Sequence, residues 1–212
     1  GNGKIIFPSN KIIPIATGLM VDVRTRSIEL DLNGSTLKLV GNAALVTATG
    51  TNVGIVSGIV LSKVGGNMTA TYPTAPTNLV IGDWIKIFSD DGLPGGHPDG
   101  GNPPRMGQAM QITNVAGKVV TLNGTMLKDY LYKTNIRASK YTSKAFTLRN
   151  GTLVGDLNQI SWKWPLVQIT SVINSVVDHL NLLNSNSFGL NFTDTINGRI
   201  TNVSFKHFHD DP

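Results

Sequence analysis

The chain has 212 residues, of which 40% are hydrophobic and only 15% are charged, with a formal net charge of +5. Soluble domains usually carry roughly 25% charged residues, so Asn, Thr, Ser and Gly must cover much of this surface. The lack of cysteine excludes disulfides and cysteine-ligated zinc, and Glu29, the single glutamate, argues against exposed helices, which favour Glu, Lys and Ala.

The first forty residues carry strand patterns. Short apolar or alternating stretches lie at 4–7, 11–15, 19–24, 28–32 and 36–40, and such stretches are typical of β-strands. Asn33 and Gly34 separate the last two and indicate a tight turn. We therefore expect an all-β fold from the start of the chain.

The middle of the chain has a different residue pattern. Residues 43–81 hold short apolar runs with Gly and Thr, and a strand pattern follows at 82–91. Residues 91–107 contain four prolines and repeated glycines, so they cannot form a strand or a helix. After this loop we expect a hairpin with strands at 109–113 and 118–122.

The last seventy residues contain a repeat with a spacing of 23. Its aligned pairs are Val167 with Leu190, Ile169 with Phe192, Ile173 with Ile196, Val177 with Ile200, His179 with Asn202, Leu180 with Val203 and Leu182 with Phe205. Residues 148–153 fit the same pattern at a spacing of 29, with Asn150 aligned to His179. This repeat argues against reading residues 171–184 as a helix.

A period of this length suits one coil of a β-solenoid, in which each turn of the chain lies one strand spacing, about 4.8 Å, above the last. Alternate side chains then point inward, so the aligned apolar residues stack in the core. Asn150, His179 and Asn202 share a polar slot, where we expect hydrogen bonds to backbone and to the same position in the next coil.

This pattern resembles the right-handed parallel β-helix of the pectate-lyase-like family, most closely phage tailspikes and capsule depolymerases. The opening "GNGKIIFPSN" is similar to the family's G-G-x-V-x-F-P-x-G-x-Y motif: Gly3, Phe7 and Pro8 match, while Asn10 and Ile13 replace a glycine and a tyrosine. The resemblance implies a first coil at 1–41, an inserted β-rich domain at 42–142 and further coils at 143–212.

The resemblance also implies a function. We expect a homotrimer in a phage tail, or outside a cell, that binds and depolymerises a bacterial surface polysaccharide as a glycosidase or a lyase. Two alternatives stay open: a structural or adhesive β-helix without activity, and a secreted lyase of the pectate-lyase type. We expect no cofactor, except that a lyase could use Ca²⁺. The basic residues are scattered, so we expect no nucleic-acid partner, and no apolar run predicts membrane insertion.

Uncharged polar residues are the candidates for sugar binding. In this family the groove often follows outward positions of one strand in each coil, and here these positions are Gln168, Thr170, Asn191 and Thr193. They could bond sugar hydroxyls or simply coat a solvated surface. Trp162 and Trp164 alternate on an extended segment, where they would stack on sugars if exposed or fill the core if buried.

Titratable residues gather in two places. His207, His209, Asp210 and Asp211 lie near the last residue and are candidates for a metal site or an acid–base pair. Asp90, Asp91 and Asp99 flank or occupy the long loop and are candidates for binding Ca²⁺ or a saccharide. An ordinary solvated turn or loop is the more common explanation of each group. Because the next coil would begin at about residue 212, we expect a fragment whose catalytic acids lie mostly further on.

Overall fold

The computed structural model describes residues 2–95, 104–158 and 164–208. The chain forms two compact units, one made of Gly1–Thr51 with Thr142–Pro212 and the other of Asn52–Tyr141. The second unit therefore begins later than the insert expected at 42–142, because residues 46–49 pair within the first unit. Apart from one 3-10 turn, every element among the described residues is a strand.

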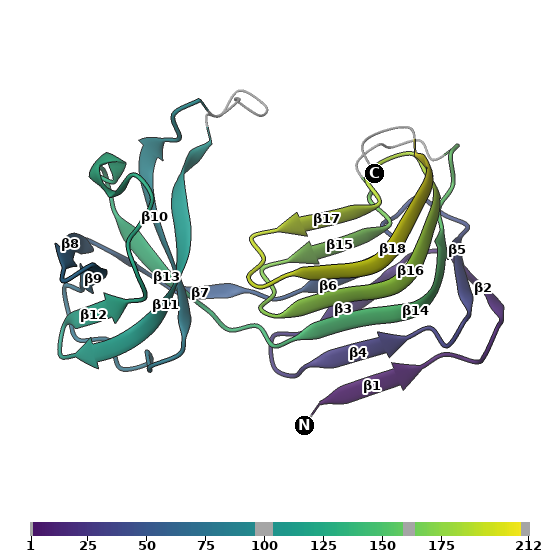
Figure 1. The fold of residues 1–212 in the computed structure, drawn as a ribbon, viewed down its shortest axis with the longest axis horizontal. Helices are drawn as coiled ribbons and strands as arrows, with labels where there is room; N and C mark the ends of the chain where they lie inside the picture. Colours follow the sequence, from purple (N-terminus) through teal and green to yellow (C-terminus); the bar gives the residue numbers. More distant parts are fainter. Residues whose placement is uncertain (1, 96–103, 159–163, 209–212) are drawn as a thin grey trace. The chain divides into compact units, whose positions relative to one another are not determined.

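The first unit is a parallel β-helix built from two sheets (Figure 1). Its strands are β1 (Gly3–Ile6), β2 (Ile12–Ile15), β3 (Leu19–Asp22), β4 (Ile28–Asp31), β5 (Thr36–Leu39), β6 (Val46–Thr49), β14 (Phe146–Val154), β15 (Val167–Thr170), β16 (Ser175–Ser185), β17 (Leu190–Thr193) and β18 (Arg199–Phe208). Sheet A stacks β1, β4, β14, β16 and β18, with β2 and β5 beside them, and sheet B stacks β3, β6, β15 and β17. This arrangement confirms the predicted fold class.

The strand register confirms the repeat. Val177 pairs with Ile200 and Val167 pairs with Leu190, both at the spacing of 23. Leu148 pairs with Val177, as the spacing of 29 predicted. The extra residues lie between the two strands, because β14 and β16 keep the same offset of 29 residues from Phe146 to Val154.

Aligned apolar residues fill the space between the sheets. Val167, Ile169, Val177, Leu180 and Leu182 are all buried, as predicted for the interior of one coil. Their partners one rung further along are more open, and Ile200 is 49% exposed and Phe205 39% exposed. Burial thus confirms the inward face of β15 and β16.

The predicted polar slot is a corner of the coil. Asn150, His179 and Asn202 have φ values of 62°, 50° and 53°, in the left-handed region that Asn tolerates better than most residues. Their hydrogen bonds differ from the prediction, because the Asn side chains donate to an aspartate in the preceding rung. Asn150 bonds Asp31 at 3.0 Å and Asn202 bonds Asp178 at 3.2 Å.

Three further corners repeat at the same spacing. Asn197 donates to the Asn174 side chain at 3.1 Å, which is a true asparagine ladder. The side chain of Ser171 bonds that of Asp194 at 3.2 Å, and His207 lies 3.1 Å from the Asn184 amide oxygen. Each of these six residues has positive φ. The polar residues of the repeat therefore mark where the chain turns.

The second unit is an antiparallel sheet with its own core, built around Ile85, Ile87, Met110 and Val120. Its sheet runs in the order β7-β13-β10-β11-β12-β9-β8. The predicted hairpin is present, with a first strand longer than expected. The elements are β7 (Asn52–Ser57), β8 (Val60–Val64), β9 (Asn67–Thr71), β10 (Trp84–Gly92), β11 (Arg105–Ala116), β12 (Val119–Leu122), the 3-10 turn η1 (Asp129–Leu131) and β13 (Arg137–Tyr141).

Candidate functional site

Sheet B brings the four predicted sugar-binding residues onto one surface. Gln168 pairs in register with Asn191, and Thr170 pairs with Thr193. Their neighbours in the strand, Val167 and Ile169, are fully buried, so the four polar side chains point outward. The Thr193 hydroxyl donates to the Asn191 amide oxygen at 3.0 Å, which orients that amide.

Two further rungs extend this surface. One row of outward residues continues from Gln168 to Thr47 and Met20, and the other continues from Thr170 to Thr49 and Asp22. The outer face of sheet B therefore carries two rows of four residues each, namely Met20, Thr47, Gln168 and Asn191, and Asp22, Thr49, Thr170 and Thr193.

Sequence reasoning missed the half of this face that precedes the insert. A signal was present, because "LVTAT" at 45–49 matches "LVQIT" at 166–170 in its pattern of apolar and polar residues. The two segments are separated by the whole inserted unit, so no constant spacing relates them. Only the pairing of β6 with β15 places them side by side.

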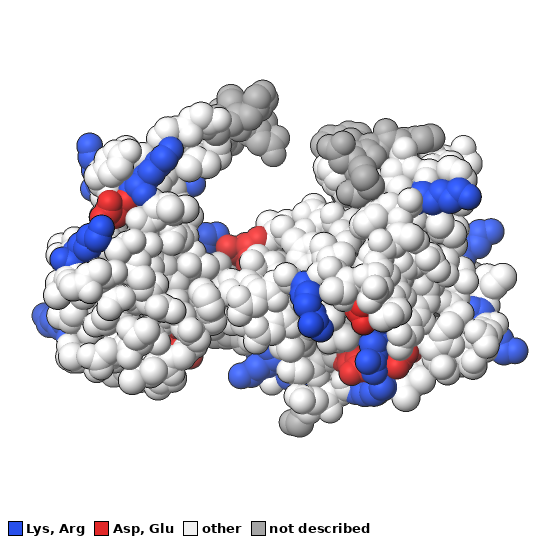
Figure 2. Space-filling model, viewed as in Figure 1, with Lys and Arg blue, Asp and Glu red and all other residues white. Residues whose placement is uncertain are grey.

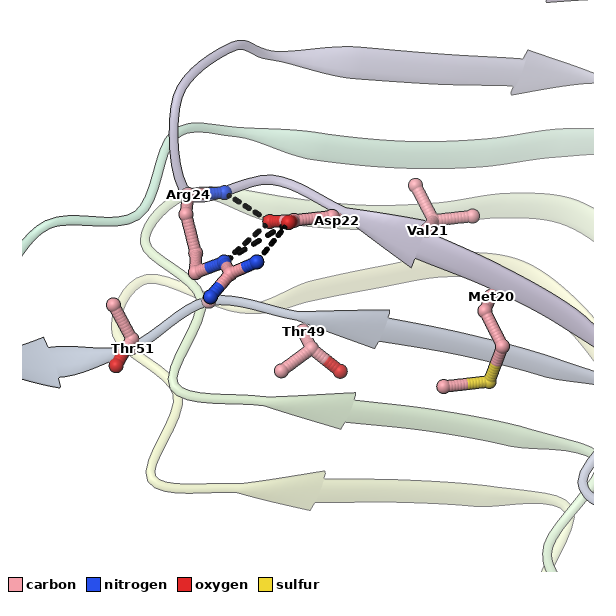
Figure 3. A pocket seen from close by; sticks show the side chains of 7 residues that line it. Met20, Val21, Asp22, Arg24, Thr49 and Thr51 are labelled. Atoms are coloured by element: carbon pink, nitrogen blue, oxygen red, sulfur yellow. Dashed lines mark hydrogen bonds and ion pairs between the residues drawn. The ribbon is translucent and has the colours of Figure 1, made fainter.

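The face is hollowed at its β3 edge. An open pocket of about 400 Å³ is lined by side chains from β3 and β6 and from the residues that follow them. Figure 3 shows Met20, Asp22 and Thr49 in this pocket, with the Arg24 guanidinium folded back onto the Asp22 carboxylate. Met20 is 74% exposed and is the one apolar side chain in these two rows, which we call the polar rows.

Asp22 and Arg24 form a close ion pair in this pocket. The Arg24 Nε atom donates to both carboxylate oxygens at 2.9 Å, and Nη2 donates to Oδ2 at 2.5 Å. These hydrogen bonds, together with one from the Arg24 backbone, lower the pKa of Asp22 to about 2. Asp22 is therefore ionised at neutral pH and cannot act there as a proton donor.

The polar groups on this face are suited to hydrogen bonding. Hydroxyl and amide groups both donate and accept hydrogen bonds, so they match the hydroxyl groups of a sugar. Because rungs are spaced at about 4.8 Å, a linear polymer laid along the stack would meet a hydroxyl or amide group on each of β6, β15 and β17. Asp22 is the only carboxylate in the two rows.

The other described carboxylates of this unit gather mainly on the outer face of sheet A. Glu29 lies 2.6 Å from Arg149 and 3.0 Å from Lys4, and Asp31 lies 3.4 Å from each of these cations. Figure 2 shows opposite charges side by side over β4 and β14. These carboxylates are neutralised within the sheet, which indicates a structural network.

Asp178 continues this network on β16. It accepts hydrogen bonds from the Thr201 hydroxyl at 2.6 Å and from Asn202, and its Oδ2 lies 2.9 Å from His179 Nδ1. These contacts, led by the Thr201 hydroxyl, lower the pKa of Asp178 to about 2. Hydrolysis of a glycosidic bond needs one carboxyl that stays protonated, and neither Asp22 nor Asp178 meets that need.

Asp90 and Asp91 lie at the end of β10 and are already partnered. The loop predicted at 91–107 is thus shorter than expected, because β10 extends to Gly92 and β11 begins at Arg105. Asp90 lies between Arg105 and Arg137, and Asn135 donates to it at 2.9 Å. Asp91 accepts the backbone N–H groups of Lys133 and Thr134 at 2.7 and 2.8 Å. A Ca²⁺ ion at Asp90 would have to compete with the guanidinium groups of Arg105 and Arg137.

The remaining candidates are dispersed. His207 occupies a left-handed corner beside Asn184, and Trp164 is 39% exposed. His209, Asp210, Asp211, Trp162 and Asp99 lie outside the described residues. Within the described ranges, no group of three or more His, Asp or Glu side chains could hold a metal ion.

Comparison with known proteins relates the chain to solved structures only. No family model matches the sequence, and no curated protein matches it. The tailspike protein gp49 from Pseudomonas phage LKA1 has a TM-score of 0.69 at 20% identity, over 92% of this chain and 33% of that chain. The fold is a tailspike-like parallel β-helix.

Two other tailspikes have related folds. The gp54 tailspike of Acinetobacter baumannii bacteriophage AP22, in complex with A. baumannii capsular saccharide, has a TM-score of 0.54 at 12% identity, over 99% of this chain and 45% of that chain. The tailspike gp61 of Pseudomonas phage phi297 has a TM-score of 0.50 at 11% identity, over 85% of this chain and 39% of that chain. This tailspike-like chain thus spans less than half the length of each of the three. No helix among its described residues is long and apolar enough to cross a membrane.

Proposed function

We propose that this chain is the part of a phage tailspike-like protein that binds a bacterial surface polysaccharide (capsule, exopolysaccharide or O-antigen) along the outer face of sheet B. The observation that carries the proposal is the pair of polar rows, which present a hydroxyl or amide group on each of three consecutive rungs. The likeness in fold to a tailspike that was solved with capsular saccharide supports the same ligand class.

Substitutions on the polar rows test this proposal. The variants Thr49→Val, Thr170→Val and Gln168→Ala remove hydrogen-bonding groups from half-buried outward positions, and valine suits a strand. We expect each to weaken binding to the cognate polysaccharide about three- to tenfold, since a net hydrogen bond contributes about 0.5–1.5 kcal/mol.

Thr147→Val is the matched control, because Thr147 is a half-buried strand residue of sheet A. Binding would be measured by surface plasmon resonance on panels of capsule and lipopolysaccharide. Unchanged affinity in all three sheet B variants would contradict the proposed face.

We also propose that the full-length protein acts as a homotrimer and depolymerises the polysaccharide. Its general acid would come from a residue other than Asp22 and Asp178, whose pKa values of about 2 keep them ionised. A reducing-end assay and an unsaturated-uronate assay of the full-length protein would detect hydrolysis and elimination respectively.

A second candidate is binding without cleavage. It is favoured by the polar rows themselves, which hold one carboxylate, paired with Arg24. Polysaccharide binding by the full-length protein with no cleavage in either assay would select this candidate over the depolymerase.

A further inference from the structure

The inserted unit contains a cleft separate from the polar rows. A hollow of about 470 Å³ lies between the edge strand β8 and the segment from η1 to Ile136. Its lining includes Ile59, Met68 and Tyr132, which are buried and form an apolar floor. An apolar floor with a few polar groups at the rim is typical of sites for small ligands.

Tyr130 stands at the rim of this cleft. It lies in η1 and is 67% exposed, so its ring is not part of the core. The Asp129 carboxylate accepts the Tyr130 backbone N–H at 2.9 Å, and the backbone N–H of Leu131 bonds the Lys128 carbonyl at 3.0 Å. An exposed ring held on a bonded turn is suited to stacking against a sugar.

Asp91 holds the opposite end of the same segment. Its carboxylate accepts the N–H groups of Lys133 and Thr134, and these hydrogen bonds lower its pKa well below the usual range. The Asp91 carboxylate therefore stays ionised and holds the backbone at Lys133, whose side chain lines the cleft. Asp91, which the sequence suggested as a Ca²⁺ ligand, thus orders one wall of the cleft.

The charges at the rim favour an anion. Lys63 on β8 and Lys133 on the facing segment both line the cleft, and both are exposed. Neither is paired with a carboxylate in the part of the chain that the structure describes. Asp129 is the one acidic residue in the lining, so the cleft carries a net charge of one positive unit.

We propose that this cleft binds an acidic sugar, a hexuronate or a sialate, as a second saccharide site of the protein. The Tyr130 ring would stack on the sugar, while Lys63 and Lys133 would bind its carboxylate through charge-assisted hydrogen bonds. The proposal rests on the proposed function for its ligand class, since an acidic sugar is here a unit of a surface polysaccharide.

Calorimetric titration of the 212-residue chain tests the cleft. The probes are glucuronate, galacturonate and N-acetylneuraminate oligosaccharides, each paired with its carboxyl-reduced neutral form. We expect at least one acidic probe to bind more tightly than its neutral form, and Lys63→Ala, Lys133→Ala and Tyr130→Ala each to weaken it about tenfold. Tyr130→Phe should retain most of the affinity, because the ring is kept.

Lys118→Ala is the matched control, because Lys118 is an exposed lysine of the same unit that does not line the cleft. Equal binding of the acidic and neutral probes, no binding of any acidic probe, or no effect of the three cleft variants would each overturn the proposal. Thr170→Val and Gln168→Ala distinguish the two sites: they should leave acidic-probe binding unchanged, even if the polar rows prove not to bind polysaccharide.

Discussion

Asn150, His179 and Asn202 occupy one corner in three successive rungs, each with positive φ. Residues other than glycine and asparagine adopt this conformation at a cost, so the corner selects its residue type through the backbone. Asp31 and Asp178, each in the preceding rung, accept hydrogen bonds from the side chains of Asn150 and Asn202 respectively. Single residues here join one rung to the next.

The hydrogen bonds that join Asp178 to the next rung depend on pH, because its carboxylate accepts them in the ionised form. Its folded pKa of about 2 lies below the ordinary value of 3.8, so its contribution to stability is present above about pH 4 and is lost as the pH falls to 2. We expect the melting temperature of Asp178→Asn to be below that of the unmodified chain at pH 7, and the difference to shrink between pH 4 and 2. Thermal melts followed by circular dichroism would measure it.

Asp156→Asn is the control for this experiment, because the Asp156 carboxylate accepts a local N–H from Asn158. A difference between Asp178→Asn and the unmodified chain that stays constant from pH 7 to 2 would contradict the assignment.

At the scale of elements, the long strands β14 and β16 bend while keeping their register, so sheet A turns without a break. The bend brings neighbouring rungs close together just after the corner. At Gly151, an added Cβ would lie 2.5 Å from the Leu32 Cβ and 2.6 Å from the Ser35 carbonyl oxygen. The absence of a side chain is therefore a requirement of stacking at this position.

Gly151→Ala tests that requirement. We expect it to lower the free energy of unfolding by about 1–3 kcal/mol, the usual cost of overpacking, measured by urea denaturation. Gly92→Ala in β10 is the matched control, since nothing lies within 4 Å of its added Cβ, and it should change stability by less than about 0.5 kcal/mol. Equal effects of the two substitutions would show that Gly151 has no special packing role.

At the scale of the whole molecule, the inserted unit leaves and re-enters the β-helix at one place. The Thr142 N–H donates to the Thr51 carbonyl at 3.1 Å, so the two ends of the interruption are adjacent. The two units also have separate hydrophobic cores. The β-helix therefore does not need the insert in order to close its core.

Replacing residues 52–141 with a short glycine-rich turn should leave the β-helix folded. We expect a β-type circular dichroism spectrum, a cooperative thermal transition, and polysaccharide binding that still responds to Gln168→Ala. Binding of acidic oligosaccharides through the Tyr130 cleft should disappear. Loss of cooperative unfolding in the shortened chain would instead show that the β-helix depends on the insert.

The fold was largely predictable because its core is periodic. Inward positions such as Val177 and Leu180 recur 23 residues later in the last coil, and the alternation of inward and outward residues is kept where the spacing is longer. The corner at Asn150 was predictable for the same reason, whereas its hydrogen bonds were not. Those bonds reach Asp31, which lies on the other side of the insert in the sequence.

The candidate site was predictable only in part. Gln168, Thr170, Asn191 and Thr193 lie on the regular coils, so alternation alone placed them on one face. The partners of Asp91 were not predictable, because they are backbone N–H groups of a segment more than forty residues away.

The residue pattern predicts a low-charge parallel β-helix, its inward residues and the polar character of one outer face, because these properties recur from coil to coil. The three-dimensional fold was needed to show how far that face extends, which carboxylates are neutralised, and that Tyr130 and the two lysines line one cleft. The reason is that most of these features depend on contacts between segments far apart in the sequence, such as the pairing of β6 with β15 and the bonds of Asp91 to Lys133 and Thr134. No local pattern encodes such contacts.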